Sequence, residues 1–87
     1  MRSDMDELKE YETPNIVLAA TLLCHGSHIS NIKLTGRNNT MGIFALTDVT
    51  QTRLMEFDQG RLLVDPTIFN MHVRRLTSMV KGVIKND

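Results

Sequence analysis

The segment from Asp65 to Ile84 constrains the fold more than any other part of the chain. Asp65 can accept hydrogen bonds from the backbone N–H groups of a first helical turn, and Pro66 suits the first helical position. Apolar residues then recur at alternating spacings of four and three, which places them on one stripe of a helix. They are Phe69, Val73, Leu76, Val80 and Val83, and the opposite side carries Arg74, Ser78, Lys81 and Lys85. The pattern predicts a long amphipathic helix with a basic back over residues 66–84, with the first four apolar residues buried.

The same start signal appears near the beginning of the chain. Thr13 is placed to cap a helix that begins with Pro14 and continues to His25. This helix is apolar almost all round, so we expect it to be covered on most sides. Gly26 follows it and is typical of a residue that ends a helix in the left-handed conformation.

Two strands are predicted after this helix. Residues 28–35 alternate between apolar and polar, with Ile32 and Leu34 on one face. Residues 41–46 are apolar on both faces, which indicates a strand that is covered twice. The segment between them, GRNNT at residues 36–40, is rich in Gly and Asn and predicts the turn of a β-hairpin.

The rest of the chain completes the predicted fold. Asp48 is a candidate cap for a short helix over residues 49–59, and residues 61–64 predict a short extended segment. Residues 1–12 are acidic with few apolar members, which favours a mobile tail or a short docking helix. The sequence therefore predicts a single α+β domain over residues 13–87 with the order α-β-β-α-(β)-α. We expect its first and last helices to cover one face of the hairpin.

Composition limits the classes of function. The 87 residues carry ten basic and ten acidic side chains, so the chain gives little general attraction to nucleic acid. The charges are polarised, because residues 1–12 hold five acids against two bases and residues 66–87 hold four bases against one acid. A single Cys, no signal-like segment and no long apolar run favour a cytoplasmic setting without a membrane anchor.

Cys24, His25 and His28 form the one cluster with metal-ligating chemistry. A closed zinc site needs four ligands, and His72 could supply a fourth only through folding, so we expect no metal and no cofactor. Cys24 and His25 are neighbours on a helix and point about 100° apart, which does not favour a nucleophile and its base. The carboxylates fall at predicted caps or on polar faces. We therefore expect no catalytic residues and no enzymatic activity.

Binding is the more plausible role for the remaining polar residues. Arg37 and Asn39 in the predicted turn, together with Arg74, Arg75 and Lys81 on the last helix, are candidate partner-binding residues. A two-stranded sheet with two long helices cannot cover all the apolar surface, which favours self-association as a dimer. The candidate self-association residues are Val17, Leu18, Met41 and Ile43.

The order of these elements resembles a family of short bacterial and phage proteins classed as a domain of unknown function. The matching segments lie within residues 11–84 and read TPNIVLAATLLCHG, MGIFAL, GRLLVDPTIF and HVRRLTSMVKGVI. The chain departs from the family at Leu46-Thr47-Asp48, where an acidic residue usually follows the Phe-containing strand. The resemblance implies no activity, cofactor or catalytic residue. It implies an accessory protein of a phage or mobile element, such as an adaptor or an inhibitor of a host protein. The cytoplasm in question would then be that of a bacterial cell or a phage-infected host.

These observations predict a small, homo-oligomeric, non-enzymatic interaction protein that binds itself, another protein, or both. The alternative is a nucleotide- or nucleic-acid-binding protein that uses the basic last helix and the loop at residues 36–40.

Overall fold

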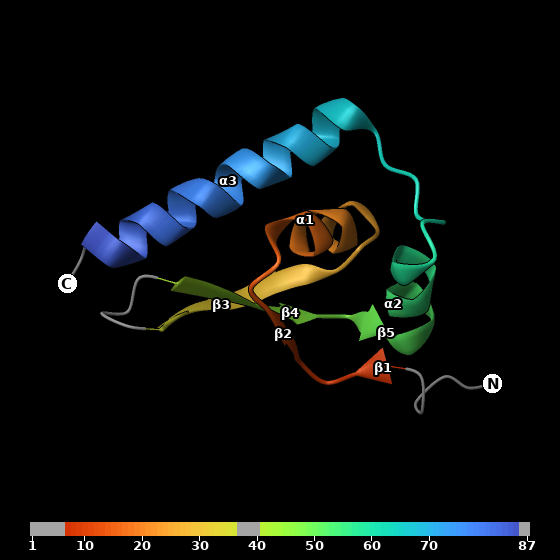
Figure 1. Cartoon of the computed structure of the whole chain (residues 1–87), viewed down its shortest axis with the longest axis horizontal. Helices are drawn as coiled ribbons and strands as arrows, with labels where there is room; N and C mark the ends of the chain where they lie inside the picture. The colour runs from red at the N-terminus through yellow and green to blue at the C-terminus, as the bar shows by residue number, and fades with distance from the viewer. Residues whose placement is uncertain (1–6, 37–40, 86–87) are drawn as a thin grey trace.

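A computed structural model describes residues 7–36 and 41–85 and confirms the α+β class (Figure 1). A long C-terminal helix packs against a hairpin, as predicted. The strands are β1 (Glu7–Leu8), β2 (Tyr11–Thr13), β3 (His28–Thr35), β4 (Met41–Thr47) and β5 (Val49–Thr50). The helices are α1 (Ile16–Cys24), α2 (Gln51–Asp58) and α3 (Pro66–Lys85).

The main sheet has three antiparallel strands in the order β2-β4-β3. β3 and β4 form the predicted hairpin, although residues 37–40 of its turn lie outside the described part of the chain. A small second sheet pairs β1 with β5. In the main sheet β4 is central, and β3 has a bulge between Ile29 and Asn31.

The prediction of a tail or docking helix before residue 13 is wrong for the described residues 7–12. They form β1 and most of β2, with Tyr11 opposite Leu46 and Thr13 opposite Phe44. Glu12 points to the other face, where it makes an ion pair with Lys33. The strands are too short to show a recognisable alternation, and long-range pairing with β4 and β5 stabilises them.

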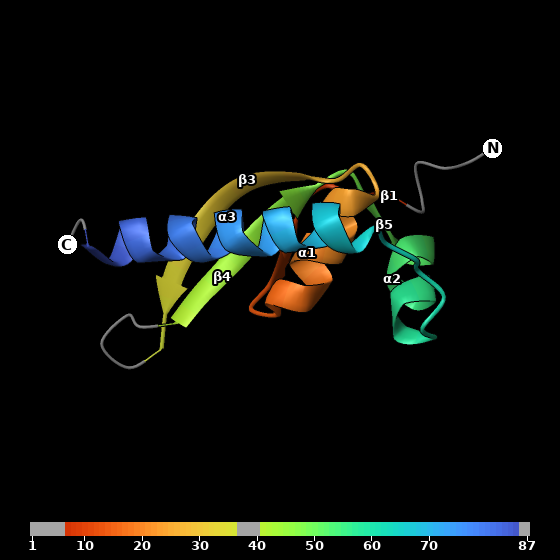
Figure 2. The same ribbon diagram turned by 90° about the horizontal axis from the view of Figure 1, so that it is seen from above.

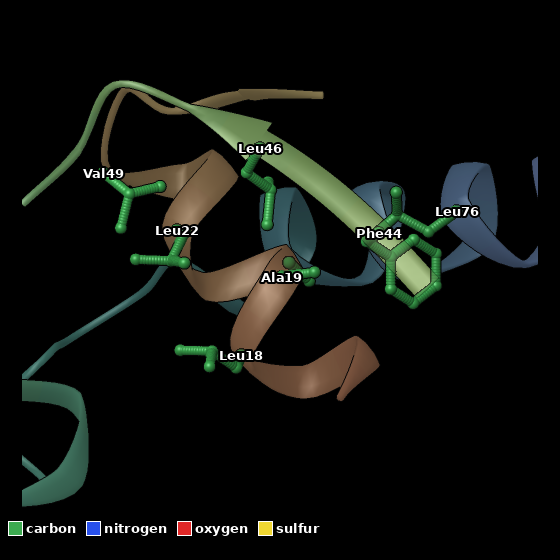
Figure 3. Close-up of a cluster of buried hydrophobic side chains, with 8 residues drawn as sticks. Leu18, Ala19, Leu22, Phe44, Leu46, Val49 and Leu76 are labelled. Carbon is green, nitrogen blue, oxygen red and sulfur yellow. The ribbon is translucent and has the colours of Figure 1, made fainter. Parts of the chain in front are cut away.

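Both long helices lie on one face of the main sheet, as predicted (Figures 1 and 2). α1 lies directly on the strands, and α3 crosses over α1 and continues above the far end of the hairpin. The core gathers between α1, β4 and α3, where Phe44 and Leu76 lie beside each other (Figure 3). The fully buried large side chains are Leu22, Leu46, Val49 and Leu76.

The start of α1 differs from the prediction. Its cap is Asn15, whose side-chain oxygen accepts hydrogen bonds from the N–H groups of Val17 at 3.0 Å and Leu18 at 3.2 Å. Thr13 instead ends β2 and accepts a hydrogen bond from the N–H of Asn15 at 3.1 Å. Asn is as good a cap as Thr or better, so the chain can begin the helix two residues later. Gly26 ends the helix with φ +98°, as predicted.

Asp48 does not cap the second helix. It adopts φ +60°, a left-handed conformation that Asp tolerates better than most residues, and Thr50 caps α2 by accepting from Arg53 N–H at 3.1 Å. Asp48 is held by Ser27, which donates to its carbonyl at 3.0 Å, and by His28, whose Nδ1 donates to its carboxylate at 2.9 Å. This turn directs Val49 and Thr50 against β1. The extended segment at 61–64 joins neither sheet.

The last helix follows its sequence signal closely. Asp65 caps it by accepting hydrogen bonds from Thr67 N–H at 2.8 Å and Ile68 N–H at 3.2 Å. Leu76 is buried as predicted, whereas Phe69, Val73 and Val80 are only partly buried and pack at the edge of the core. No described helix is both long and apolar enough to cross a bilayer.

Candidate interaction surface

One side of α3 exposes apolar side chains that the fold leaves uncovered. Ile68, Met71 and Met79 are 46%, 48% and 38% exposed, and Arg75 lies between the two methionines at spacings of four. Residues spaced by three and four share a helix face, so these side chains form one stripe. The centre of the stripe is about a third of a turn away from the residues that face the core. A mixed apolar and basic stripe of this kind is typical of a binding surface.

This stripe borders the free edge of the sheet. β3 is an edge strand of eight residues, and β4 is its one neighbour in the described sheet. A hollow of about 430 Å³ separates Ile29–Ile32 from Met79, Gly82 and Val83. A second hollow, of about 290 Å³, continues it between the turn at Gly26–Ile29 and the helix at His72, Arg75 and Met79. We call this region the β3–α3 surface; it consists of Ile29–Ile32 and of Ile68, Met71, Arg75, Met79 and Gly82.

Gly82 has no role in the internal packing of the described chain. A Cβ added there would meet no atom within 4 Å. By contrast, a Cβ added at Gly42 would approach Val80 Cγ2 to 3.0 Å, so a side chain at position 42 would crowd Val80 where α3 crosses β4. A Gly inside a helix costs about 1 kcal/mol relative to Ala. Packing within the described chain therefore does not require Gly at position 82, and the backbone of α3 is open to the outside there.

The predicted partner-binding residues divide between two sides of α3. Arg74, Arg75 and Lys81 are all exposed. Arg75 belongs to the β3–α3 surface, whereas Arg74 is about 100° further round the helix and shares the polar back with Lys81, seven residues later. Arg37 and Asn39 lie outside the described residues.

The structure does not bring the four predicted self-association residues together. Leu18 is in the core with 7% exposure, so the prediction of an exposed role for it is wrong. Val17 is exposed on α1, on the helical side of the sheet. Met41 and Ile43 are on the opposite, open face, because Gly42 between them faces α3. The sheet separates Val17 from the other two, and no single patch contains them.

That open face is largely polar. The ion pair between Glu12 and Lys33 crosses it, and Ser30 donates a hydrogen bond to Glu10 at 2.8 Å. The predicted cover on both faces of β4 is therefore found only in part, because α1 and α3 lie on one face and Ile43 on the other face is half-buried. Ala45 is nevertheless fully buried on the open face. It lies between Glu12 and Asn31 of the neighbouring strands.

The cluster of Cys24, His25 and His28 does not form a shared site, because the two histidines have separate partners. The Nε2 of His25 donates to the carbonyl of Leu63 at 2.8 Å, so its Nδ1 is the acceptor that faces an Arg53 N–H at 3.4 Å. His28 is bound to Asp48. Burial, and to a smaller extent the Asp65 carboxylate, raises the pKa of the Cys24 thiol, which makes it a poor nucleophile. Within residues 7–36 and 41–85, no three His, Cys, Asp or Glu side chains are grouped to hold a metal ion.

The sequence contains only a partial signal for the β3–α3 surface. Met71 and Met79 lie outside the apolar stripe that the spacing predicts for the last helix. Their exposure depends on where α1 and the sheet lie. The free edge of β3 followed from the placement of β2 on the far side of β4.

No protein-family model, curated protein or solved structure matches this chain.

Proposed function

We propose that this protein is a small non-enzymatic interaction protein that binds a protein partner through the β3–α3 surface. The observation that carries the proposal is the stripe of exposed Ile68, Met71 and Met79 beside β3, which pairs with β4 alone among the described strands. Exposed apolar residues that cluster next to a hollow and an Arg are characteristic of protein interfaces. An edge strand adds main-chain hydrogen bonds to such contacts.

The resemblance to phage and mobile-element proteins suggests the biological setting of this binding. Under that interpretation the protein is a homo-oligomeric adaptor or an inhibitor of a host protein. A surface that combines apolar contacts with a sheet edge suits either role, because both act by occupying another protein rather than by chemistry.

The alternative function is nucleotide or nucleic-acid binding. The exposed Arg74, Arg75 and Lys81 favour it, since exposed cations on one helix can contact phosphates. Neighbouring arginines separate the two functions because they lie on different sides of α3. Arg75 borders the apolar stripe, whereas Arg74 lies on the polar back. Protein binding through the β3–α3 surface therefore depends on Arg75 far more than on Arg74, while phosphate binding depends on both.

The test is affinity purification from the native cells with wild type, Met71→Lys, Arg75→Glu and Arg74→Glu. We expect wild type and Arg74→Glu to co-purify with a bound protein, either a different protein or an untagged copy of this chain. Nuclease treatment should not release that protein. Met71→Lys and Arg75→Glu should lose it. Partners unaffected by any of these changes would refute binding at this surface. Recovered nucleic acid that Arg74→Glu and Arg75→Glu both abolish would support the alternative.

A further inference from the structure

We propose that the partner on the β3–α3 surface is a second copy of this chain, related by a two-fold axis that pairs β3 with its counterpart. This inference rests on the proposed function and identifies its partner. A two-fold axis perpendicular to the sheet brings two β3 strands together antiparallel. The two three-stranded sheets then form one sheet of six strands, and the two α3 helices lie side by side above the junction.

The lengths of the elements suit this arrangement. β3 has eight residues and is about 26 Å long at ~3.3 Å per residue, and α3 has 20 residues and is about 30 Å long. Each copy thus offers a strip about 26 Å long and about 20 Å wide, allowing ~10 Å each for the helix and the helix–sheet spacing. Its projected area is about 500 Å², and side-chain relief brings the accessible area towards the ~800 Å² per partner of a standard interface.

Gly82 supplies the second argument. It borders the same hollow as the middle of β3, so the axis that joins two β3 strands also brings the two helices closest near Gly82. The missing side chain leaves space for the partner's helix. Met79 lies one turn away and would pack across the axis. A Gly at this position is thus compatible with a close approach of the two helices.

Charge is compatible with self-pairing. Arg75 lies seven residues from Gly82, or about 10 Å along α3, so the two guanidinium groups are about 20 Å apart in the dimer. That separation exceeds the screening length of ~8 Å at physiological salt. If the axis passes the middle of β3, between Asn31 and Ile32, Lys33 falls opposite Ser30 of the second copy and therefore near Glu10, which accepts a hydrogen bond from Ser30. Within its own chain Lys33 also makes the ion pair with Glu12. Opposite charges thus meet on the open face.

The first test compares two exposed methionines. Met79 on the β3–α3 surface and Met55 on α2 are 38% and 60% exposed, so Lys at either position should leave the fold intact. Sedimentation equilibrium at micromolar concentrations should give wild type and Met55→Lys about twice the chain mass of 9.9 kDa. Met79→Lys should give the mass of one chain. A dimer that Met79→Lys leaves unchanged, or a monomeric wild type, would overturn the proposal.

Gly82→Ala provides a second test, because the change should stabilise the monomer but weaken the dimer. In a monomer, the change raises the melting temperature by a few degrees, because Ala favours the helix and meets no neighbour. In the dimer the added methyl obstructs the partner's helix and weakens association at least several-fold. We expect weaker association in the wild-type background and a higher melting temperature in the Met79→Lys background. Equal association of wild type and Gly82→Ala would contradict a close approach at Gly82.

Hydrogen exchange separates edge pairing from helix contact alone. Amides of residues 28–35 that point away from β4 should exchange slowly in the dimer and quickly in Met79→Lys. A dimer whose β3 amides exchange as fast as those of the monomer would refute strand pairing and would show that the bulge in β3 keeps the edge open. A third outcome separates the two proposals: the wild-type protein is a monomer, but it binds a different protein and Met71→Lys abolishes that binding. This outcome would refute self-pairing and would leave the proposed function intact.

Discussion

Replacing Leu76 with Ala tests the attachment of α3 to the core. Leu76 is 1% exposed and lies beside Phe44, so its side chain is surrounded by apolar neighbours (Figure 3). Removing three carbons forfeits about 2.4 kcal/mol at ~0.8 kcal/mol per buried carbon. A residual cavity of a few tens of Å³ adds about 1 kcal/mol at ~24 cal/mol per Å³. The expected loss of about 3–4 kcal/mol is a large part of the ~4–13 kcal/mol that 87 residues usually provide.

Leu63→Ala is the matched control, because it deletes the same atoms from a side chain that is 85% exposed. It should change the free energy of unfolding by less than ~0.5 kcal/mol. Urea unfolding followed by circular dichroism at one fixed protein concentration measures both variants, since association contributes equally at that concentration. The melting temperature of Leu76→Ala should fall by roughly 15–25 °C. Equal midpoints for the two variants would refute the packing of α3 described above.

Three further predictions concern local contacts. Gly42→Ala should lower the free energy of unfolding by about 1–3 kcal/mol, because its Cβ would approach Val80 Cγ2 to 3.0 Å. In urea unfolding, the added change Val80→Ala should relieve part of that loss, and strictly additive effects of the two changes would contradict the contact. In thermal unfolding, Asn15→Ala should lower the free energy of unfolding by about 1 kcal/mol, while Asn15→Asp should leave it nearly unchanged. Equal losses for the two variants would show that the helix cap is unimportant. Burial first and Asp65 second raise the pKa of Cys24, so iodoacetamide should label it more slowly at neutral pH than a free cysteine. Asp65→Asn keeps the helix cap and should speed that labelling, and labelling at the free-thiol rate in wild type would contradict the effect of burial.

Predictions from the sequence agree with the structure best where the signal lies in a few neighbouring residues. The cap at Asp65, the left-handed Gly26 and the hairpin strands each depend on residues within a few positions of one another, and all three were predicted. Errors arose where two local solutions compete. Asn15 rather than Thr13 caps α1, and Thr50 rather than Asp48 caps α2, because neighbouring polar residues offer similar caps and the pairing of β2 and β5 selects between them.

The candidate site shows the same division. From the sequence alone it follows that α3 is amphipathic, that Leu76 faces a core and that Arg74 and Lys81 lie on the polar back, because helical spacing assigns each side chain to a direction. Tertiary structure decided that residues 11–13 pair with β4, which leaves the edge of β3 free on the opposite side. It also decided that α1 and the sheet cover one flank of α3 and leave Met71 and Met79 uncovered. Periodicity tells which side chains share a face, but only the packing of distant segments determines which faces are covered.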